Sequence, residues 1–340
     1  MKIAILTPTY SHFSGIDRLV ELESEKLIKE GNTVDIFALD ATLTPKNSKL
    51  FILGMPKNPS LQRIYRLLMF LDLKKVNKYA NILKHYDLII SHLYPMNLLA
   101  SKAKKKNQKL KYIYHNAGVG ITDTYSFPER LYLKLFNHFS NRSIKNCDSA
   151  ISISKFLRDQ LKEETGINST VEYVPIDKKR FSKKTSPEEI KKKLKLGKGP
   201  ILLYVGRISP HKGIHMLIKA FNKVQKQYPE AKLVIAGKHT FPKYTKQLNR
   251  LANPNVIFTG FVKDEDLPKY YSACDIYTTA SLWEGFDMPI VEAYYAGKPS
   301  VAFDVGAHPE VLKKGKLVKK GDIDGFADAI LSILKRNKFK

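Results

Sequence analysis

Short apolar runs alternate with longer amphipathic segments along the first half of the chain. Strand-like runs such as KIAILTPTY and NTVDIFAL are separated by helical patterns over residues 18–30 and 60–84. Apolar strands that alternate with amphipathic helices typically form parallel sheets through crossover connections. This order predicts a doubly wound α/β domain.

A second alternation of the same kind follows in the other half. The stretch 172–199 interrupts the pattern with proline, glycine and a lysine run, which is typical of a domain connection. Strand-like runs resume with PILLYVGR and CDIYTTA, and 340 residues are enough for two domains. We therefore expect an α/β protein with two doubly wound, Rossmann-like domains, 1–175 and 176–340, and a cleft into which the carboxyl ends of both sheets open.

The positive net charge favours anionic partners but does not identify which kind. The net charge is +26, with 26 Lys+Arg against 16 Asp+Glu in residues 1–175 and 32 against 16 in residues 176–340. A field of this sign attracts nucleic acid, anionic lipid or phosphorylated substrates. A lysine-rich, solvated surface is the alternative explanation.

The sequence gives no sign of export or membrane spanning. No apolar stretch reaches the ~20 residues that cross a bilayer, and the amino terminus has no small-residue cleavage site. Cys147 and Cys274 each precede an Asp and an apolar run, which favours buried, reduced thiols over a disulfide or a metal pair. We expect a cytoplasmic protein.

The strand-like run PILLYVGR leads directly into ISPHKG and a helical pattern. Arg207 and Lys212 then flank one turn at the carboxyl end of a strand, next to a helix start. Free amides, the helix dipole and two side-chain charges together favour an anion such as a diphosphate. In the alternative, Arg207 pairs with a local acid and Lys212 is solvated.

A second motif lies in the segment 281–299, which predicts a strand end, a glycine-containing loop and a helix. Asp287 stands at the N-cap position and Pro289 in the first turn of that helix. Glu284 precedes the loop and Glu292 lies inside the helix. Ionised carboxylates can accept hydrogen bonds from vicinal hydroxyls of a sugar or a ribose, although Glu292 alone also fits an ordinary solvent-facing helix residue.

These motifs, in this order, resemble the retaining glycosyltransferases of family 4, which have the GT-B fold. The resemblance covers nearly the whole second half and includes VGRISPHKG and EGFDMPIVEA. In the first half it is looser, and rests on a strand followed by a turn with Gly15, on His115 after a strand, and on CDSAISIS. The resemblance supplies expectations for both donor and acceptor.

The resemblance implies metal-independent transfer of a hexose-type sugar from a UDP-, GDP- or ADP-sugar to a lipid-linked or glycan acceptor, with no cofactor. Arg207 and Lys212 would neutralise the diphosphate leaving group, and such preorganised cations are typically worth ~3–4 kcal/mol each. Glu284 would hold a donor hydroxyl and Glu292 the ribose. His115 would face the donor sugar, unless its ring is satisfied inside a turn. The other substrate-binding residues implied are Gly15, Gly206, Phe261 near the base, and Gly285, Phe286, Asp287, Met288 and Pro289 around the sugar and phosphate.

Two features depart from the family pattern. The family usually has glycine at the position of Asp287, which suggests that helix capping replaces close backbone approach to the sugar. The chain also stops at AILSILKRNKFK, before the last helix of relatives, so weaker coupling between domains is expected.

Basic and apolar residues share one long segment of the first half. Residues 60–84 combine Arg63, Arg66, Lys74, Lys75 and Lys78 with large apolar residues at helical spacing, which predicts one basic amphipathic helix. Such a helix can lie on an anionic membrane, where each basic residue is worth ~1 kcal/mol, and the cluster 102–111 can add to it. Many family 4 enzymes use lipid-linked acceptors, so we expect peripheral attachment to the inner membrane face. Core packing with a solvated basic edge is the alternative.

Two further functions are compatible with part of the sequence. A catalytically silent subunit that binds sugar nucleotides would explain the residue Asp287 and the short carboxyl end. A nucleic-acid-binding protein is suggested by charge alone, but we find no basic residues interleaved with aromatics and no groove-reading helix. Nucleic acid is therefore not an expected partner.

Overall fold

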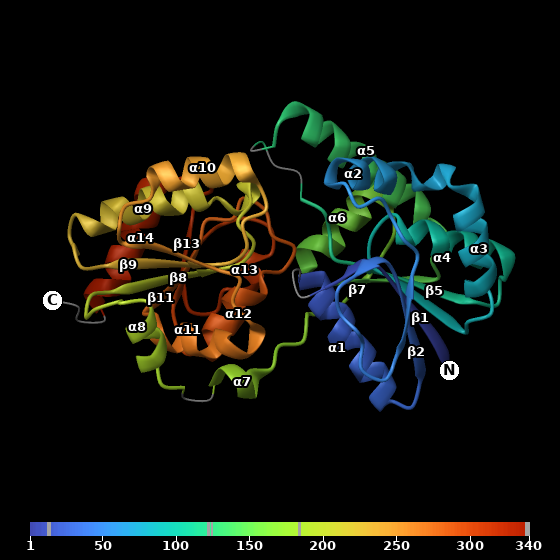
Figure 1. Ribbon diagram of the computed structural model, residues 1–340, viewed down its shortest axis with the longest axis horizontal. Helices are drawn as coiled ribbons and strands as arrows, with labels where there is room; N and C mark the ends of the chain where they lie inside the picture. The colour runs from blue at the N-terminus through green and yellow to red at the C-terminus, as the bar shows by residue number, and fades with distance from the viewer. Residues whose placement is uncertain (12–14, 121–122, 124, 183–184, 337–340) are drawn as a thin grey trace. The chain divides into compact units, whose positions relative to one another are not determined.

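The chain folds into two compact units, Met1–Pro175 and Ile176–Lys340. This computed structural model describes residues 1–11, 15–120, 123, 125–182 and 185–336. Each unit has its own parallel sheet covered by helices on both faces (Figure 1). The prediction of two doubly wound α/β domains is confirmed.

The first unit contains a seven-stranded parallel sheet in the order β3-β2-β1-β4-β5-β6-β7. Strand β1 lies between β2 and β4, and its Ile5 pairs with Ile36 of β2 and with Ile90 of β4. Nearly every residue of that strand is buried, as expected for a strand covered on both faces. The strands are β1 (Lys2–Tyr10), β2 (Thr33–Ala41), β3 (Lys49–Ile52), β4 (Leu88–Ser91), β5 (Lys111–Asn116), β6 (Ser149–Ser152) and β7 (Thr170–Val171).

Helices of the first unit close two apolar cores, one on each face of the sheet. Helix α1 contacts β1 and β2, whereas α4 contacts β1, β4 and β5 and also contacts α3. The helical elements are α1 (Gly15–Lys29), α2 (Pro59–Leu68), η1 (Met69–Leu71), α3 (Leu73–Leu83), α4 (Met96–Lys106), α5 (Phe127–Ser143) and α6 (Lys155–Thr165).

The prediction of a single helix over residues 60–84 is wrong. The segment forms α2, the 3₁₀ turn η1 and α3, with Asp72 between the turn and the last helix. The Asp72 carboxylate accepts a hydrogen bond from the backbone N–H of Lys75 (3.1 Å), so it caps a new helix. A short carboxylate that bonds nearby amides competes with helix continuation, which explains the break.

The second unit contains a six-stranded parallel sheet in the order β10-β9-β8-β11-β12-β13. The central strand β8 pairs with β9 and with β11, as in Leu203 with Val234 and with Tyr277. The strands are β8 (Ile201–Val205), β9 (Lys232–Ala236), β10 (Val256–Gly260), β11 (Ile276–Thr279), β12 (Ser300–Phe303) and β13 (Gly315–Val318).

Helices α9, α10 and α14 lie on one side of this sheet and α8, α11 and α12 on the other (Figure 1). One large apolar core lies beneath α9 and α14. The helical elements are α7 (Lys178–Ser182), α8 (Glu188–Lys193), η2 (Pro210–Lys212), α9 (Ile214–Gln225), α10 (Pro242–Leu251), η3 (Asp264–Asp266), α11 (Leu267–Ala273), α12 (Met288–Tyr295), α13 (His308–Val311) and α14 (Ile323–Arg336).

Strand order reverses once in each sheet, between β1 and β4 and between β8 and β11. Ligands of open parallel sheets bind at such a reversal, outside the carboxyl ends of the strands. The loops that follow β8 and β11 in the second unit, and β1, β4 and β5 in the first, are therefore the places to look for a site.

Two smaller expectations concern cysteines and membrane spans. Both Cys147 and Cys274 are free thiols, and burial raises the pKa of Cys274 to about 12. Within the described ranges, the structure has no helix with the length and apolarity that a bilayer crossing requires.

Candidate functional site

The loops after β8 and β11 are locked together at the strand reversal of the second unit. The backbone N–H of Leu282 donates a hydrogen bond to the carbonyl of His211 (2.8 Å). Gly213 has φ 62°, and a Cβ atom there would lie 1.9 Å from the carbonyl oxygen of Ala280. Only glycine fits this close approach, so the two loops form one rigid platform.

Two of the expected side chains already pair with each other on this platform. The Lys212 ammonium donates a hydrogen bond to Glu284, and both side chains are largely buried. Arg207 is exposed, and among the described residues no acceptor binds its guanidinium. The alternative in which Arg207 pairs with a local acid and Lys212 is solvated is therefore wrong: the acid pairs with Lys212.

His211 lies between these charged groups. Burial lowers the pKa of His211 to about 3, with Lys212 and Arg207 acting in the same direction and Glu284 against them. The imidazole is thus neutral near pH 7, with its Nδ1 at 3.2 Å from the hydroxyl of Ser209. All three charged groups therefore lie close enough to His211 to influence its pKa.

Asp287 adopts a left-handed backbone conformation, φ 68° and ψ 73°, just before α12. The expectation that its side chain caps this helix is wrong, because no capping hydrogen bond forms. Capping residues have extended φ/ψ, and the positive φ of Asp287 does not meet that condition. The carboxylate instead accepts a hydrogen bond from His308 Nε2 (2.9 Å).

His308 is fully buried at the start of α13 and is hydrogen-bonded at both ring nitrogens. Nδ1 lies 2.6 Å from the carbonyl oxygen of Phe303, and Nε2 faces Asp287. Both partners are acceptors, so both nitrogens carry hydrogen and the ring is an imidazolium. Burial opposes this charge, but the Asp287 carboxylate, helped by Glu284, raises the pKa of His308 above its usual value.

Glu292 points into the interior from α12, so the alternative of a solvent-facing residue is wrong. Its carboxyl is buried and accepts a hydrogen bond from the hydroxyl of Tyr271 (2.7 Å). Burial raises the pKa of Glu292 to about 7, although the Tyr271 hydroxyl acts in the opposite direction. The protonated and ionised forms are therefore both populated near neutral pH.

The remaining expected residues surround the same strand ends, with one exception. Gly206 directly follows β8 with φ 150°, and Phe261 follows β10 and is exposed. Gly15 belongs to the first unit and opens α1, and residues 12–14 before it lie outside the described residues. In the loop before α12, Gly285 and Phe286 are buried, whereas Met288 and Pro289 are half-buried.

The sequence predicted that His115 follows a strand. The structure instead places it inside β5 of the first unit, where it is buried. Its Nδ1 lies 3.1 Å from Glu23 Oε1, while the other oxygen of Glu23 lies 2.9 Å from Nε2 of His92. His92 directly follows β4, and the two rings are 4.9 Å apart between centroids. One carboxylate thus holds two imidazoles at the carboxyl ends of adjacent strands.

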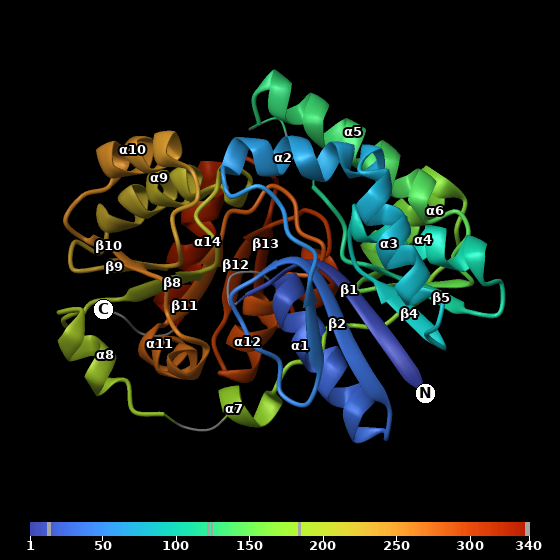
Figure 2. The same cartoon turned by 45° about the vertical axis from the view of Figure 1, so that its right-hand side comes forward.

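Helices α2 and α5 contact each other and run side by side (Figures 1 and 2). Between them they expose six large apolar side chains, spaced three to four residues apart on each helix. Lys104, from the basic cluster 102–111, is buried and bonded to Asp148 (2.7 Å), so it cannot extend this surface. The α2–α5 surface consists of Leu61, Ile64, Leu68, Phe127, Leu131 and Leu135.

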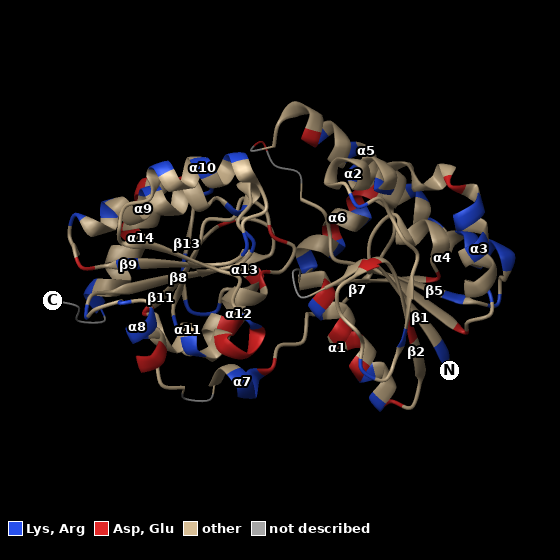
Figure 3. Cartoon of the chain, viewed as in Figure 1, with Lys and Arg blue, Asp and Glu red and all other residues tan. Residues whose placement is uncertain are grey.

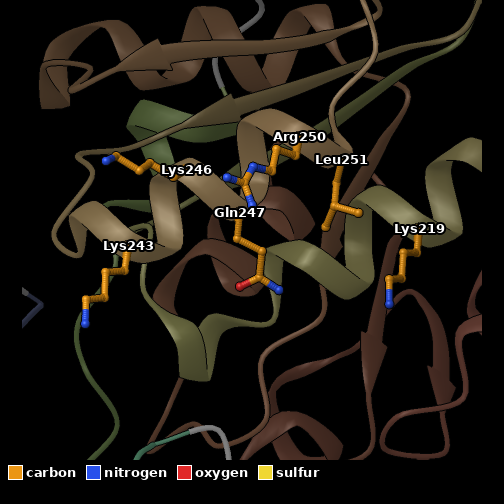
Figure 4. A pocket seen from close by; sticks show the side chains of 6 residues that line it. All are labelled: Lys219, Lys243, Lys246, Gln247, Arg250 and Leu251. Carbon is orange, nitrogen blue, oxygen red and sulfur yellow. The ribbon is translucent and has the colours of Figure 1, made fainter.

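Basic residues are spread over both units (Figure 3), and the side chains of four of them line a groove between α9 and α10 (Figure 4). The groove has a volume of about 390 Å³, and none of its four cations has an acidic partner among the residues that the structure describes. No residue expected to bind substrate lies in it. Its lining consists of Lys219, Lys243, Lys246, Gln247, Arg250 and Leu251.

Two clusters of described residues have the composition of a metal site, Glu284 with Asp287 and His308, and Glu23 with His92 and His115. The first fits a metal poorly, because His308 uses both nitrogens and Lys212 occupies Glu284. In the second, ring nitrogens bond to the shared carboxylate.

Sequence reasoning missed five residues that shape these sites. His211 stands inside the quoted motif VGRISPHKG and His308 in the segment AHPE, but nothing in the spacing indicated that one ring would be neutral and the other charged. Glu23, His92 and Tyr271 come from elements that contain no motif, and only the sheet topology brings them to the sites.

Sequence comparison matches the two halves of the chain to two family models. The model described as Glycosyltransferase Family 4 matches residues 13–178, and that of Glycosyl transferases group 1 matches residues 185–340. Spore coat protein SA of Bacillus subtilis is 32% identical over 141 residues, which are 38% of this chain and 37% of that protein. A GDP-mannose-dependent alpha-(1-6)-phosphatidylinositol monomannoside mannosyltransferase of Mycobacterium tuberculosis is 28% identical over 205 residues, 55% of this chain and 52% of that protein.

The matched segments thus span about a third to a half of these two curated relatives. Solved structures are similar over almost the whole chain. Anabaena Alr3699/HepE, in complex with UDP and glucose, superposes with a TM-score of 0.76 at 21% identity, over 99% of this chain and 91% of that one. WaaG, a glycosyltransferase involved in lipopolysaccharide biosynthesis, also reaches 0.76, at 15% identity over 98% and 91%. These similarities confirm the expected fold class.

Proposed function

The chain belongs to family 4 of the glycosyltransferases, and on this premise we propose that it transfers a hexose-type sugar from a nucleotide-diphosphate donor to a lipid-linked or glycan acceptor. The observation that carries the proposal is that two cations and two carboxylates follow the two strands at the strand reversal of the second unit, where Lys212 pairs with Glu284. Arg207 and Lys212 follow β8, while Glu284 and Glu292 follow β11.

The donor diphosphate would bind next to Arg207, whose guanidinium is exposed and unpaired among the described residues. Lys212 and Glu284 lie beside it as an ion pair, so a donor can insert its phosphate at the ammonium and a sugar hydroxyl at the carboxylate. Both charged groups then exchange one partner for another without being left unpaired, which keeps the cost of opening the pair small.

Charge on the leaving diphosphate is largest when the glycosidic bond has broken. Cations that are already in place stabilise that charge at the transition state more than in the ground state, which accelerates the reaction. We assign this role to Arg207 and Lys212, with retention of configuration and without a metal. Glu292 would bind the ribose from its buried position on α12.

The acceptor side of the proposal rests on the α2–α5 surface. This surface exposes six apolar side chains, which would be stabilised by burial at the acyl boundary of a membrane. Arg63 and the exposed Lys134 lie on the same helices and would attract anionic headgroups. The mannosyltransferase of M. tuberculosis acts, by its name, on a phosphatidylinositol mannoside. A lipid-linked acceptor at an anionic membrane surface is the partner that these features favour.

A thermal-shift screen of the full chain with UDP, GDP and ADP tests the donor site. A ligand at 100 times its Kd adds ~2.7 kcal/mol of stability, which gives a clear shift. Arg207→Ala and Lys212→Ala should each remove most of the shift and lower turnover ~100-fold to ~1000-fold. Arg250→Ala, which removes an exposed guanidinium from α10, is the matched control and should behave as the wild type.

The same variants separate an enzyme from a silent subunit. The substitution of the family glycine by Asp287 favours a chain that binds the donor without turnover, so donor hydrolysis should be measured with and without candidate acceptors. Binding without any turnover would support the silent subunit, and near-normal turnover in Arg207→Ala and Lys212→Ala would contradict the assigned roles. Retained activity in a chelator would support metal independence.

Sedimentation with vesicles tests the membrane partner. The full chain should bind vesicles rich in anionic lipid, and added salt should weaken the binding. Ile64→Ser with Leu131→Ser should abolish it, whereas Leu317→Ser, at another exposed apolar site, should not. Absence of salt-sensitive binding in a folded sample would defeat this part of the proposal.

A further inference from the structure

Glu23, His92 and His115 form a buried cluster at the strand reversal of the first unit. Glu23 comes from α1, His92 follows β4 and His115 lies at the end of β5. The backbone N–H of His92 also bonds the carbonyl of Leu6 in β1 (3.1 Å), which fixes the loop after β4 to the central strand. The cluster therefore occupies the place where parallel sheets bind their ligands.

The charges of the cluster follow from its contacts. Burial opposes ionisation of Glu23, but His92 and His115 together hold the pKa of its carboxyl well below its usual range. Burial lowers the pKa of His92, so this ring is neutral near pH 7. An ionised carboxylate only accepts hydrogen bonds, so each ring donates to it.

The donating nitrogens differ between the two rings. His92 donates from Nε2 (2.9 Å) and His115 from Nδ1 (3.1 Å), so Glu23 selects opposite tautomers. The free nitrogens are then Nδ1 of His92 and Nε2 of His115. Both are buried, and neither has a hydrogen-bond partner among the residues that the structure describes.

Buried polar atoms without a partner are uncommon in folded proteins, and in a site they often mark the place of a ligand atom. A neutral ring nitrogen without hydrogen is an acceptor, and a hydroxyl is a donor of matching size. His115 is 5% exposed and His92 is 0% exposed, so the residue His115 is the less buried of the two.

The resemblance to family 4 already implies that His115 faces the sugar substrate. We propose that Glu23 is a positioning residue of this site, because its hydrogen bond to Nδ1 of His115 keeps Nε2 free of hydrogen and able to accept from a sugar hydroxyl. The role of Glu23 rests on the proposed transferase function. His92 holds the second oxygen of Glu23, so the carboxylate cannot rotate away from His115.

A metal ion is the rival occupant, because one ligand atom from each of the three residues lies within 4.8 Å of the others. In metal sites, a ligating imidazole almost always donates its other N–H to a neighbouring acceptor. Here the outer nitrogens of both rings have no partner. The arrangement fits a hydroxyl-binding cluster better than a metal site.

Nitrogen-15 spectra of histidine side chains in the full chain test the tautomers directly, with His92→Asn and His115→Asn to assign the signals. The unliganded protein should show His115 protonated at Nδ1 and His92 at Nε2. Hydrogen on Nε2 of His115, or tight binding of Zn²⁺ with displacement of the ring protons, would overturn the inference. This measurement is made with Glu23 in place, so it does not depend on whether a Glu23 variant folds.

Steady-state kinetics with UDP-, GDP- and ADP-glucose then test whether the positioning of His115 by Glu23 matters for turnover. Glu23→Gln offers one acceptor to two ring N–H groups, so kcat/KM should fall ~10-fold to ~100-fold with loss of the wild-type tautomer pair. Glu25→Gln removes the same charge from the same helix and should change kcat/KM less than ~2-fold.

Unchanged kcat/KM in a folded Glu23→Gln protein would sink the positioning role. Absence of turnover by the wild type with all three donors would count against the proposed function instead. The tautomers of the unliganded protein would still decide whether Glu23 arranges the two rings.

Discussion

Asp287 has a φ of 68°, a conformation that costs an ordinary L-residue about 1–2 kcal/mol and costs glycine almost nothing. The loop before α12 therefore keeps the backbone that the family glycine would allow, even though a carboxylate now stands there. His308 balances that carboxylate from a fully buried position. The departure from the family pattern is compensated by a residue 21 positions away.

Replacement of His308 should destabilise the second unit strongly. His308→Ala leaves the buried Asp287 carboxylate without its partner, so the free energy of unfolding should fall by about 3–5 kcal/mol. The raised pKa of His308 means that its stabilisation is complete below the unfolded value of ~6.5 and is lost as pH rises through the folded value. Urea denaturation at ~pH 6 and ~pH 9 should therefore show a larger difference from wild type at the lower pH. An equal difference at both values would exclude a charged His308.

Donor affinity should depend on the ionisation of Glu292. Ribose hydroxyls donate best to the ionised form, and the pKa of Glu292 is about 7 in the empty site. Affinity for a nucleoside diphosphate should therefore fall up to ~10-fold per pH unit below ~7. Calorimetry across this range, with Glu292→Gln as the comparison, isolates the effect from the titration of the phosphate. A Glu292→Gln protein with the same pH dependence as the wild type would contradict the ribose contact.

Folding stability should respond to Glu292 in the opposite sense. Its folded pKa lies above the ordinary value of 4.5, so the folded protein binds more protons between ~4.5 and ~7. The contribution of Glu292 to stability therefore declines as pH rises through this window. Glu292→Gln should flatten that part of the pH profile of unfolding.

At the level of single residues, the sequence predicted which side chains follow β8 and β11 but not how they pair. Arg207 and Lys212 share one loop by spacing alone, so their proximity could be read from the sequence. The pairing of Lys212 with Glu284 joins residues 72 positions apart and depends on the order of strands in the sheet. Protonation states such as that of His308 depend on burial, which one sequence does not give.

Among the helices and strands, the break at Asp72 is the clearest difference between expectation and structure. Apolar and basic residues repeat at helical spacing from Ser60 to Lys84, and periodicity alone cannot show a change of axis. Asp72 supplies the local signal, because an Asp that bonds the third following amide is a typical helix start. The strands were predicted more accurately because buried parallel strands are continuous apolar runs.

Asp72→Ala should loosen the junction between η1 and α3. The substitution removes the cap on the Lys75 amide and the acceptor of the Tyr65 hydroxyl (3.1 Å), so unfolding should become about 1–2 kcal/mol easier. Chemical denaturation measures the change, and hydrogen exchange should rise first in the opening turn of α3. Asp72→Asn retains an acceptor oxygen and should recover most of the loss.

Over the whole molecule, the two units are built alike but present different chemistry at their strand reversals. The second unit gathers Arg207, Lys212, Glu284 and Glu292, whereas the first gathers a carboxylate and two imidazoles. The class of each unit could be predicted from alternation alone, because each half repeats the strand and helix order of a doubly wound sheet. Residues 12–14, which precede Gly15, lie outside the described residues.

Binding of a nucleoside diphosphate alone should be confined to the second unit. We expect hydrogen-exchange protection in residues 206–213 and 284–292, where the proposed diphosphate and ribose contacts lie. Residues 1–175 should change least, because no proposed contact of the nucleotide comes from them. Strong protection around β4 and β5 with the nucleotide alone would mean that the assignment of donor contacts is incomplete.

The ion pair between Lys212 and Glu284 has a consequence for selectivity inside a cell, where free orthophosphate is abundant. A small inorganic anion could reach Arg207, but it would have to pull Lys212 away from Glu284 and leave a buried carboxylate with nothing in exchange. A sugar nucleotide brings a hydroxyl for that carboxylate along with its phosphates. If the donor binds as proposed, the resting site thus disfavours free orthophosphate relative to the complete sugar nucleotide.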